Sequence, residues 1–311
     1  MNRRHFVAAV GSGFAAALLP AVRLSARAPV RFIERWSWAM GQPVHLQLFA
    51  ASDDQGYAAA EAALAELWRV EKHLSLFDDA SDLMELNRRA GRRALHAGSD
   101  LQSIVCASLR FERETNGAFN VAVEPLMRAW GFHAHRSSEP TPGELAKARA
   151  AVAHARIVEE GELISLPATE TQLDFGGIGV GYALDRAVEV LRKAGITSAF
   201  LDVSGDCLAL GAPPGESGWL VEIAAPQGNG KIVASTRIAD LALATSANSR
   251  SVVEYHRAVR GHVMNPRTGW PADALRQVTV VARTGIEADA LSTAMLVSGK
   301  PDRGVMRYYT A

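Results

Sequence analysis

The stretch Asp174–Asp206, DFGGIGVGYALDRAVEVLRKAGITSAFLDVSGD, carries the signals around which the rest of the chain is arranged. A Gly-dense turn leads into an amphipathic helix that ends at Gly195, and a β-branched strand at 197–203 ends in the polar turn Ser204-Gly205-Asp206. Glycines before a helix let backbone N–H groups crowd a ligand, and a helix N-terminus favours a phosphate. The glycines of the turn are Gly176, Gly177, Gly179 and Gly181.

The glycine spacing matches neither of two well-known phosphate-binding loops. A Rossmann fingerprint needs G-x-G-x-x-G after a strand, and a P-loop needs Gly-Lys-Ser/Thr, which this chain lacks. On its own, a Gly-rich turn before a helix is more often only a tight turn than a site. Acidic residues stand at both borders of the stretch, Asp174 and Asp206, and they favour a metal or nucleotide site.

Composition sets the broad class. Of the 311 residues, 48% are hydrophobic, which suffices for one large core or two joined subdomains. Lys plus Arg and Asp plus Glu number 33 each, so no overall field attracts nucleic acid and we expect no nucleic-acid partner. Cys106 and Cys207 are expected to be buried small side chains without a disulfide between them.

The N-terminus has the pattern of an export signal. Arg3 and Arg4 precede an apolar run at 7–19 and small residues before position 28. The run is too short to span a membrane, and paired arginines followed by Phe resemble a twin-arginine signal, which serves proteins exported in the folded state. We predict a cleavable signal at residues 1–28, a functional domain at 29–311 and a periplasmic location; a basic tail on a cytosolic protein is the alternative.

Hydrophobic periodicity predicts an α+β fold, with helices concentrated before residue 155 and strands after it. Besides the central helix, helices are expected at 53–73, 81–87, 100–115, 123–130, 144–152 and 287–297. Strands are expected at 44–49, 156–159, 163–166, 207–210, 219–224, 232–238, 241–244, 252–259 and 278–282. Turns are expected at Met40-Gly41 and 265–271, and a surface loop at 133–142.

A few residues have the chemistry of a site, although each has an ordinary structural explanation. Asp289 and Thr293 lie four apart on the last helix, so one face would offer a carboxylate and a hydroxyl, the hard oxygen ligands that Mg²⁺ prefers. His262 is a candidate general base, although a lone His is usually packed or exposed. Phe77 can stack on a planar ring, although core packing is the default for an aromatic residue.

The order of short motifs along the chain is more specific than any one of them. The motifs are Met40-Gly41, Leu74-Ser75-Leu76-Phe77, Ser81, Leu86-Asn87, Gly117-Ala118-Phe119-Asn120, Pro125-Leu126, Trp130-Gly131-Phe132, Asp174-Phe175-Gly176-Gly177-Ile178, Gly181-Tyr182-Ala183-Leu184-Asp185, Gly205-Asp206, Ala244-Thr245-Ser246, His262-Val263-Met264-Asn265-Pro266-Arg267-Thr268-Gly269, Ala288-Asp289-Ala290 and Thr293-Ala294. In this order, over roughly residues 36–300, the chain resembles the ApbE family of FAD:protein FMN transferases.

The resemblance implies an activity and a set of site residues. The family reaction moves FMN from FAD to a Thr or Ser hydroxyl of a flavoprotein and releases AMP, with Mg²⁺ at the pyrophosphate. By resemblance, the metal ligands would be the Gly177 carbonyl, Asp289 and Thr293. The FAD site would comprise Met40, Phe77, Ala118, Phe119, Asn120, Asp174, Val180 and Val263. Our hypothesis is that His262 or Asp206 accepts the proton of the target hydroxyl.

Export and the resemblance together suggest acceptor flavoproteins of membrane-associated or periplasmic electron-transfer chains. This chain departs from the family pattern at four positions. Val180 stands where many members carry Lys, Asn120 and Asn265 where Asp is usual, and Ser292 where some members place a further acidic ligand. Loss of the Lys and an Asp would weaken contacts to the FAD phosphates or reshape the acceptor site. Two rival functions therefore stay open: a FAD-binding protein that has lost transfer, and an enzyme that hydrolyses FAD to FMN and AMP.

Overall fold

A computed structural model describes residues 30–134, 136–226, 231–249, 251–255, 258–272, 277–301 and 305–310. The export signal predicted at 1–28 lies outside these residues, so it stays a prediction. Within the described part, no helix is both long enough and apolar enough to cross a membrane.

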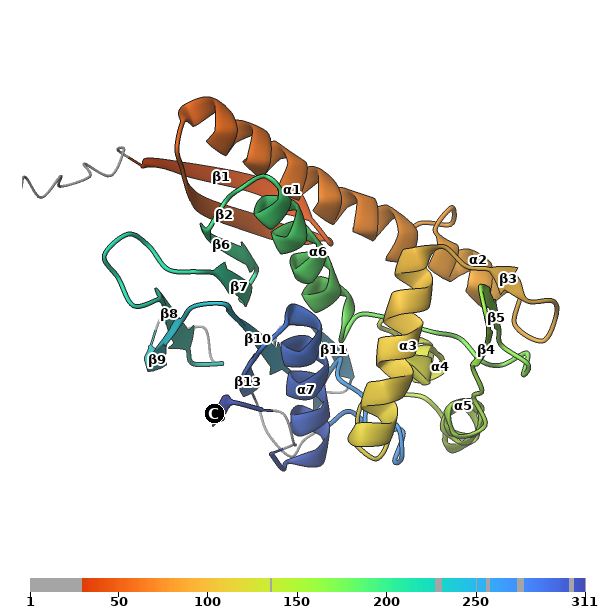
Figure 1. The fold of residues 1–311 in the computed structure, drawn as a ribbon. Helices are drawn as coiled ribbons and strands as arrows, with labels where there is room; N and C mark the ends of the chain where they lie inside the picture. Colours follow the sequence, from red (N-terminus) through yellow and green to blue (C-terminus); the bar gives the residue numbers. More distant parts are fainter. Residues whose placement is uncertain are drawn as a thin grey trace, which may run out of the picture.

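An antiparallel sheet of seven strands forms the centre of the structure, in the order β1-β2-β6-β7-β10-β13-β14 (Figure 1). These strands are β1 (Arg31–Ala39), β2 (Gln42–Ala50), β6 (Ser198–Val203), β7 (Asp206–Leu210), β10 (Leu241–Ala247), β13 (Gln277–Ala282) and β14 (Arg307–Thr310). The smaller sheets use β3 (Leu95–His96), β4 (Val158–Glu160), β5 (Leu163–Ser165), β8 (Trp219–Ala224), β9 (Ile232–Ile238), β11 (Val252–Tyr255) and β12 (Ala258–Gly261).

Helices cover one face of this sheet, and the β8–β9 ribbon packs on the other (Figure 1). The helices are α1 (Asp53–Leu74), α2 (Asp82–Arg88), α3 (Ser99–Glu114), α4 (Glu124–Ala129), α5 (Pro142–Ala153), α6 (Gly179–Lys193) and α7 (Gly285–Ser298), with a 3₁₀ turn η1 at Val121–Val123. Residues of β6 alternate between the two cores: Leu201 faces the helices, whereas Phe200 stacks on Trp219 with ring centroids 5.6 Å apart. The architecture is α+β, as the sequence predicts.

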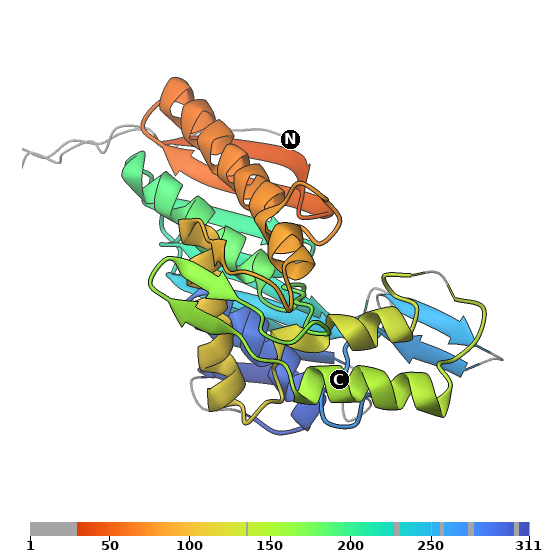
Figure 2. The ribbon, with the colours of Figure 1, turned by 90° about the vertical axis from the view of Figure 1, so that its right-hand side faces the viewer.

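A smaller unit of α4, α5 and the β11–β12 hairpin projects to one side of the sheet (Figure 2). Its own apolar cluster includes Trp130, which is fully buried. The indole Nε1 of Trp130 donates to the Gly269 carbonyl at 2.8 Å, and the Tyr255 hydroxyl donates to the Trp130 carbonyl at 2.7 Å. These bonds tie the 265–271 turn to α4, so the loop that follows β12 is fixed relative to the sheet.

Helices α6 and α7 cross at two glycines. A Cβ on Gly181 would lie 2.2 Å from the backbone oxygen of Gly285, and one on Gly285 would lie 2.3 Å from the Gly181 oxygen. Asp185 of α6 accepts from the backbone N–H groups of Gly285 at 2.6 Å and Ile286 at 3.0 Å, which satisfies the first turn of α7. Burial raises the pKa of Asp185 to about 6, although these backbone donors lower it.

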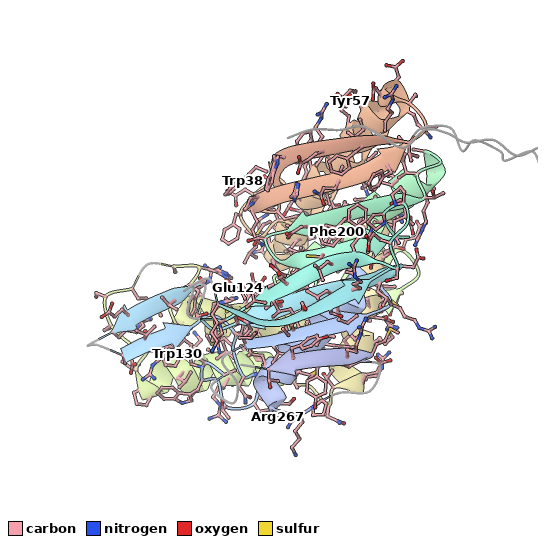
Figure 3. All side chains as sticks on the ribbon, turned by 90° about the vertical axis from the view of Figure 1, so that its left-hand side faces the viewer. Trp38, Tyr57, Glu124, Trp130, Phe200 and Arg267 are labelled. Carbon is pink, nitrogen blue, oxygen red and sulfur yellow. The ribbon has the colours of Figure 1, made fainter. Side chains whose placement is uncertain are left out.

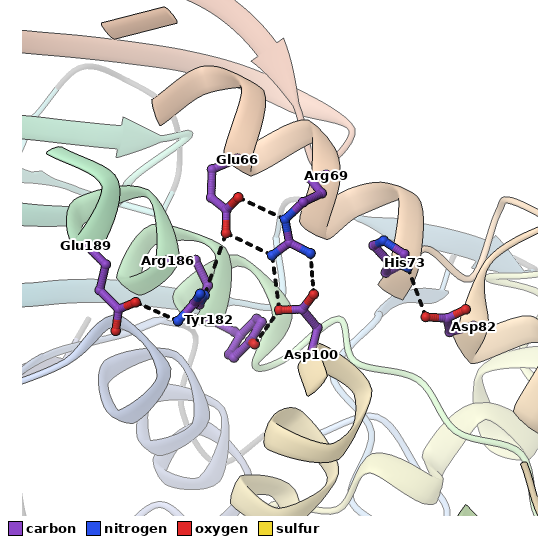
Figure 4. A network of polar contacts seen from close by, with 8 residues as sticks. All are labelled: Glu66, Arg69, His73, Asp82, Asp100, Tyr182, Arg186 and Glu189. Carbon is purple, nitrogen blue, oxygen red and sulfur yellow. Dashed lines mark hydrogen bonds and ion pairs between the residues drawn. The ribbon is translucent and has the colours of Figure 1, made fainter. Parts of the chain in front are cut away.

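A polar network joins α6 to α1 and α3 (Figure 4). The Tyr182 hydroxyl donates to Asp100 Oδ1 at 2.6 Å, and Arg69 bridges Asp100 and Glu66. Burial raises the pKa of the Asp100 carboxyl, but Arg69 and Tyr182 outweigh burial and hold that pKa below its usual value. The network therefore fixes the N-terminal half of α6 against two other helices.

Most expected elements are confirmed, with shifts of a few residues at their ends. The Met40-Gly41 turn joins β1 to β2 with positive φ at both residues, and Gly299 ends α7 with φ 69°. Neither Cys106 nor Cys207 forms a disulfide with the other in the described part of the chain. Strands β1 and β14 lie at the two edges of the sheet; β1 was not predicted, and β14 falls within the short C-terminal segment that the periodicity left open.

Three expectations are wrong. The strand predicted at 252–259 is the β11–β12 hairpin, because the chain reverses between Tyr255 and Ala258. Cys106 is exposed rather than buried, because it lies on the outer face of α3. Gly179 and Gly181 are helical and not part of the preceding turn, because α7 leaves no room for a side chain at Gly181. The loop predicted at 133–142 is confirmed in its described residues up to α5, although the His133 ring at its start packs edge-on against Phe77 with only 12% of the side chain exposed.

We predict that Gly181→Ala destabilises the protein by about 1–3 kcal/mol, because the added methyl group overpacks the α6–α7 crossing and outweighs the better helix propensity of Ala. Urea denaturation of both proteins measures this difference. Gly143→Ala is the matched control, since a Cβ there meets no atom within 4 Å in helix α5. Equal stability of Gly181→Ala and the wild type would contradict the assigned role of the crossing.

Candidate functional site

One cleft of about 320 Å³ gathers twelve of the thirteen site residues that the sequence predicts. It lies between the turn before α6, the β6–β7 turn, the end of β10, helix α7 and the loops of the projecting unit. The predicted residues that line it are Phe77, Ala118, Phe119, Asn120, Asp174, Gly177, Val180, Asp206, His262, Val263, Asp289 and Thr293. Met40, the remaining one, lines an adjoining hollow that shares Phe77, Asp174 and Val180 with the cleft.

The deepest corner of the cleft holds two carboxylates. Asp289 is 5% exposed, and its Oδ2 accepts from the Gly181 backbone N–H at 3.0 Å. Burial, with the nearby charge of Asp206, raises the pKa of Asp289 well above its usual value, and the Gly181 N–H offsets only part of this. Asp206 begins β7 beside a tight turn and accepts from the Thr245 N–H at 2.8 Å. Two carboxylates brought together in this way favour a bound cation.

Oxygen groups surround this corner. Thr293 lies one turn after Asp289 on α7, and a Cβ on Gly177 would lie 3.0 Å from Thr293 Oγ1, so only glycine lets the Gly177 backbone approach so closely. Ser246 of β10 shares hydrogen bonds with Ser292 Oγ at 2.7 Å and Thr293 Oγ1 at 3.1 Å. Ser292 also donates to the Asp289 carbonyl at 2.9 Å. Ser292, through its hydrogen bond to Ser246, therefore links α7 to β10.

These groups fit a hard divalent cation such as Mg²⁺, which prefers oxygen ligands and keeps several waters. Asp289, the Thr293 hydroxyl and the Gly177 carbonyl would hold it, with the Asp206 charge nearby. Among the described residues there is no cluster of three or more His, Cys, Asp or Glu side chains that could hold a metal. A cation here therefore depends on one or two carboxylates, a hydroxyl and a backbone carbonyl, a weak set that a bound phosphate would complete.

Asn120 stands where the family usually has Asp, and its amide has two partners. Its Oδ1 accepts from the Ala122 N–H at 2.7 Å, which caps η1, and its Nδ2 donates to Glu112 Oε1 at 3.0 Å. Burial raises the pKa of the Glu112 carboxyl. An Asp at 120 would place a second acidic group against Glu112 with no N–H to donate, so the asparagine matches the glutamate that this chain carries on α3.

The loop after β12 places His262 and Val263 in the wall of the cleft. The backbone N–H of His262 donates to the Ser251 carbonyl at 3.1 Å, and the backbone N–H of Val263 donates to Asn248 Oδ1 at 3.0 Å. The Asn248 amide also donates to the Ala272 carbonyl. Asn248 thus fixes the backbone of Val263, next to the candidate base His262.

An aromatic and acidic wall forms another side of the cleft. Phe77 leaves 82% of its surface exposed, which frees its ring for a ligand. Asp174 accepts from the Gly176 N–H at 2.7 Å, and burial raises its pKa, although the charge of His133 lowers it. Val180, in the first turn of α6, adds an apolar surface where a Lys would bring a charge.

Sequence reasoning missed several residues that line the cleft or support it. They are His133, Ser246, Thr245, Gln42, Ser251 and, behind His133, Glu124. The Thr245-Ser246 pair belongs to a motif that the sequence did single out, so its place in the cleft was accessible from the pattern. Nothing in the sequence marked Glu124 and His133, because only the turn after α4 brings them together.

Comparison with known proteins gives one consistent family. The model described as the ApbE family matches residues 40–307. A Klebsiella pneumoniae protein named FAD:protein FMN transferase is 28% identical over 268 residues, covering 84% of this chain and 77% of that one. A Treponema pallidum protein of the same name is 29% identical over 298 residues, covering 88% and 80%. The crystal structure of the ApbE protein of Thermotoga maritima has a TM-score of 0.79 at 25% identity, covering 86% and 87%.

We predict that Asp289→Asn raises the thermal midpoint of the metal-free protein at neutral pH and removes its stabilisation by Mg²⁺. The folded-state pKa of Asp289 lies above its unfolded value, so its contribution to stability is present at low pH and is lost as the pH rises through the folded pKa. The advantage of the Asn variant should therefore shrink towards about pH 4.

Differential scanning fluorimetry with and without Mg²⁺ measures both effects. Wild-type protein at about 100 times the Kd for Mg²⁺ should gain about 2.7 kcal/mol. Asp54→Asn, an exposed position at the start of α1, is the control and should respond to Mg²⁺ like the wild type. Equal Mg²⁺ stabilisation of the wild type and Asp289→Asn would exclude Asp289 as a ligand.

Proposed function

This chain belongs to the ApbE family, and we propose that it is a flavin transferase that moves FMN from FAD to a Thr or Ser hydroxyl of a target flavoprotein, with Mg²⁺, and releases AMP. The proposal is supported by the names of its Klebsiella and Treponema relatives, both FAD:protein FMN transferase. It goes beyond those names in the metal, the acceptor hydroxyl and the released nucleotide.

The observation that carries the proposal is the pairing of an acidic, oxygen-lined corner with an exposed aromatic ring in one cleft. Asp289 and Thr293 offer metal ligands, and Phe77 offers a stacking surface for a heteroaromatic ring. The α6 N-terminus adds the positive end of its helix dipole, which suits a phosphate. A dinucleotide such as FAD would place its pyrophosphate at the metal ligands and one of its two ring systems on Phe77.

The reaction consists of one displacement at phosphorus. The acceptor hydroxyl oxygen forms a bond to the phosphorus on the FMN side, and the bond from that phosphorus to the bridging oxygen breaks. AMP leaves with the bridging oxygen and the electron pair, and the proton of the hydroxyl passes to a base. A divalent cation, when bound, neutralises charge that develops on the pyrophosphate.

Two side chains at the cleft can accept that proton. His262 lies in the wall of the cleft on a loop that Asn248 fixes. Asp206 lies deeper, beside Asp289, and would share the field of a bound cation. The position of His262 favours it as the base, and Asp206 then supports the metal corner.

The acceptor and the compartment follow from the same proposal. The signal pattern at residues 1–28 supports export, and an exported flavin transferase would modify periplasmic or membrane-associated flavoproteins. The rival binder is favoured by Val180, which leaves the α6 N-terminus without a Lys. The rival hydrolase needs only water in place of the acceptor hydroxyl.

Intact mass spectrometry tests the activity. Mature protein is mixed with FAD, Mg²⁺ and an acceptor domain that carries the family's target Thr, and the acceptor should gain the mass of one covalent FMN with equimolar AMP. The acceptor with that Thr changed to Val is the control for the site of attachment and should gain no mass.

AMP released without labelled acceptor would contradict transfer and support hydrolysis. FAD bound without either product would support the binder, and Val180→Lys would be the first reversion to make.

We predict that His262→Ala lowers the transfer rate at saturating FAD by on the order of 10²–10⁴-fold while FAD still binds, because the base is lost and the phosphate site remains. Single-turnover transfer kinetics measure the rate, and fluorescence titration measures binding. Asp206→Asn is the comparison, and it should mainly weaken the dependence on Mg²⁺. A His262→Ala protein that transfers at the wild-type rate would remove histidine from the role of base.

A further inference from the structure

The buried carboxylate of Glu124 lies beside the ring of His133, and each of the two groups has one buried atom without a hydrogen-bond partner in the described part of the chain. Glu124 is 1% exposed; its Oε1 accepts from Arg128 at 2.7 Å, whereas its Oε2 has no hydrogen-bond partner in the described part of the chain. His133 Nδ1, also buried without a partner there, lies 3.8 Å from Glu124 Oε1. A hydrogen bond between the two groups would satisfy both, and buried polar atoms rarely stay without one.

The other ring nitrogen of His133 faces the cleft. His133 Nε2 lies 3.9 Å from Asp174 Oδ2, and the imidazole meets the Phe77 ring edge-on at 5.5 Å and 88°. Glu124, His133 and Asp174 therefore form a line from the interior to the cleft wall. Figure 3 marks Glu124 where the sheet meets the projecting unit.

The charge of the Glu124 carboxylate supports a contact between Glu124 and His133. Burial raises the pKa of Glu124, but His133 and Arg128 together bring it below its usual value, so the carboxylate is charged. A buried carboxylate that has to keep its charge needs a donor on its free side. His133 is the group placed to supply that donor through Nδ1.

We propose that His133 is a ligand-binding residue of the cleft, oriented by the buried Glu124, and that it acts with Asp174 on the polar edge of a heteroaromatic ring stacked on Phe77. The proposal rests on the proposed function, because FAD is the ligand that brings such a ring. In the imidazolium form, in which both ring nitrogens carry a hydrogen, His133 donates from Nδ1 to Glu124 and from Nε2 to a ring acceptor, and the Asp174 carboxylate accepts from a ring N–H. Glu124 is the positioning residue that directs Nδ1 inward.

The flavin and the adenine of FAD both present an acceptor next to an N–H donor, so both satisfy this pattern. The structure therefore assigns the hydrogen-bonding pattern of the ring edge that is recognised. Separate binding measurements with FMN and AMP tell whether that ring is the flavin or the adenine. A residue that reads a ring edge contributes to ground-state binding and not to the displacement at phosphorus. Its loss should thus raise KM and Kd for FAD and leave kcat unchanged.

Fluorescence and calorimetric titrations of the mature protein with FAD, FMN and AMP, in Mg²⁺, test the proposal. His133→Phe keeps an aromatic ring against Phe77 and should raise the Kd for FAD about tenfold, the effect of one lost hydrogen bond. The same loss should appear with FMN alone if the flavin is bound there, or with AMP alone if the adenine is. His96→Phe is the matched control, since His96 pairs with Glu162 at 2.6 Å on the surface, and it should bind FAD like the wild type.

A double-mutant cycle separates positioning from a merely structural role. Glu124→Gln should weaken FAD binding about threefold, and in that background His133→Phe should cost less than it does alone. His133→Asn keeps a donor and should recover part of the affinity, which also covers the case in which the Phe variant folds poorly.

Wild-type Kd in both folded His133 variants, or a fall in kcat at unchanged KM, would overturn the proposal while leaving the transferase intact. Strictly additive effects of Glu124→Gln and His133→Phe would overturn the role of Glu124. A wild-type protein that binds no FAD would overturn this proposal and the proposed function together.

Discussion

The backbone contact between Gly181 and Gly285 is the constraint on which the rest of the site depends. A side chain on either residue would overlap the other helix, so α6 and α7 approach as closely as they do only because both residues are glycine. This approach brings the Asp289 carboxylate to the Gly181 N–H and lets Asp185 cap α7. The motif Gly181-Tyr182-Ala183-Leu184-Asp185 therefore encodes a helix crossing, and the position of the buried Asp289 carboxylate is its consequence.

The same crossing explains why the acidic corner is tolerated. Asp289 is buried next to Asp206, an arrangement that costs stability without a cation. The polar network of Tyr182, Asp100 and Arg69 anchors α6 from the other side (Figure 4). The hydroxyls of Ser246 and Ser292 form a hydrogen bond that joins β10 to α7. Hydrogen bonds of Tyr182, Ser246 and Ser292 thus stabilise the helices around Asp289 and Asp206. They offset the cost of burying two carboxylates close together.

Much of the fold and of the site could be predicted from the sequence, because helix periods, caps and motif order are local signals. The pattern from Asp53 to His73 gives α1 almost to the residue, and Asp289 with Thr293 is a spacing on one helix. The bounds of the β11–β12 hairpin could not be predicted, because its strands are short and pack in a cluster that includes the distant Leu126 and Trp130. Glu124 and His133 are nine apart across an irregular turn, a separation that has no periodic signature.

A structure of the mature protein with FAD and Mn²⁺, which scatters anomalously and replaces Mg²⁺, tests the central claim most directly. An anomalous peak bound by the Asp289 carboxylate, the Thr293 hydroxyl and the Gly177 carbonyl, with the pyrophosphate beside it, is the predicted result. A peak elsewhere in the cleft, or FAD bound with its pyrophosphate away from α7, would contradict the claim that the α6–α7 crossing builds the metal site.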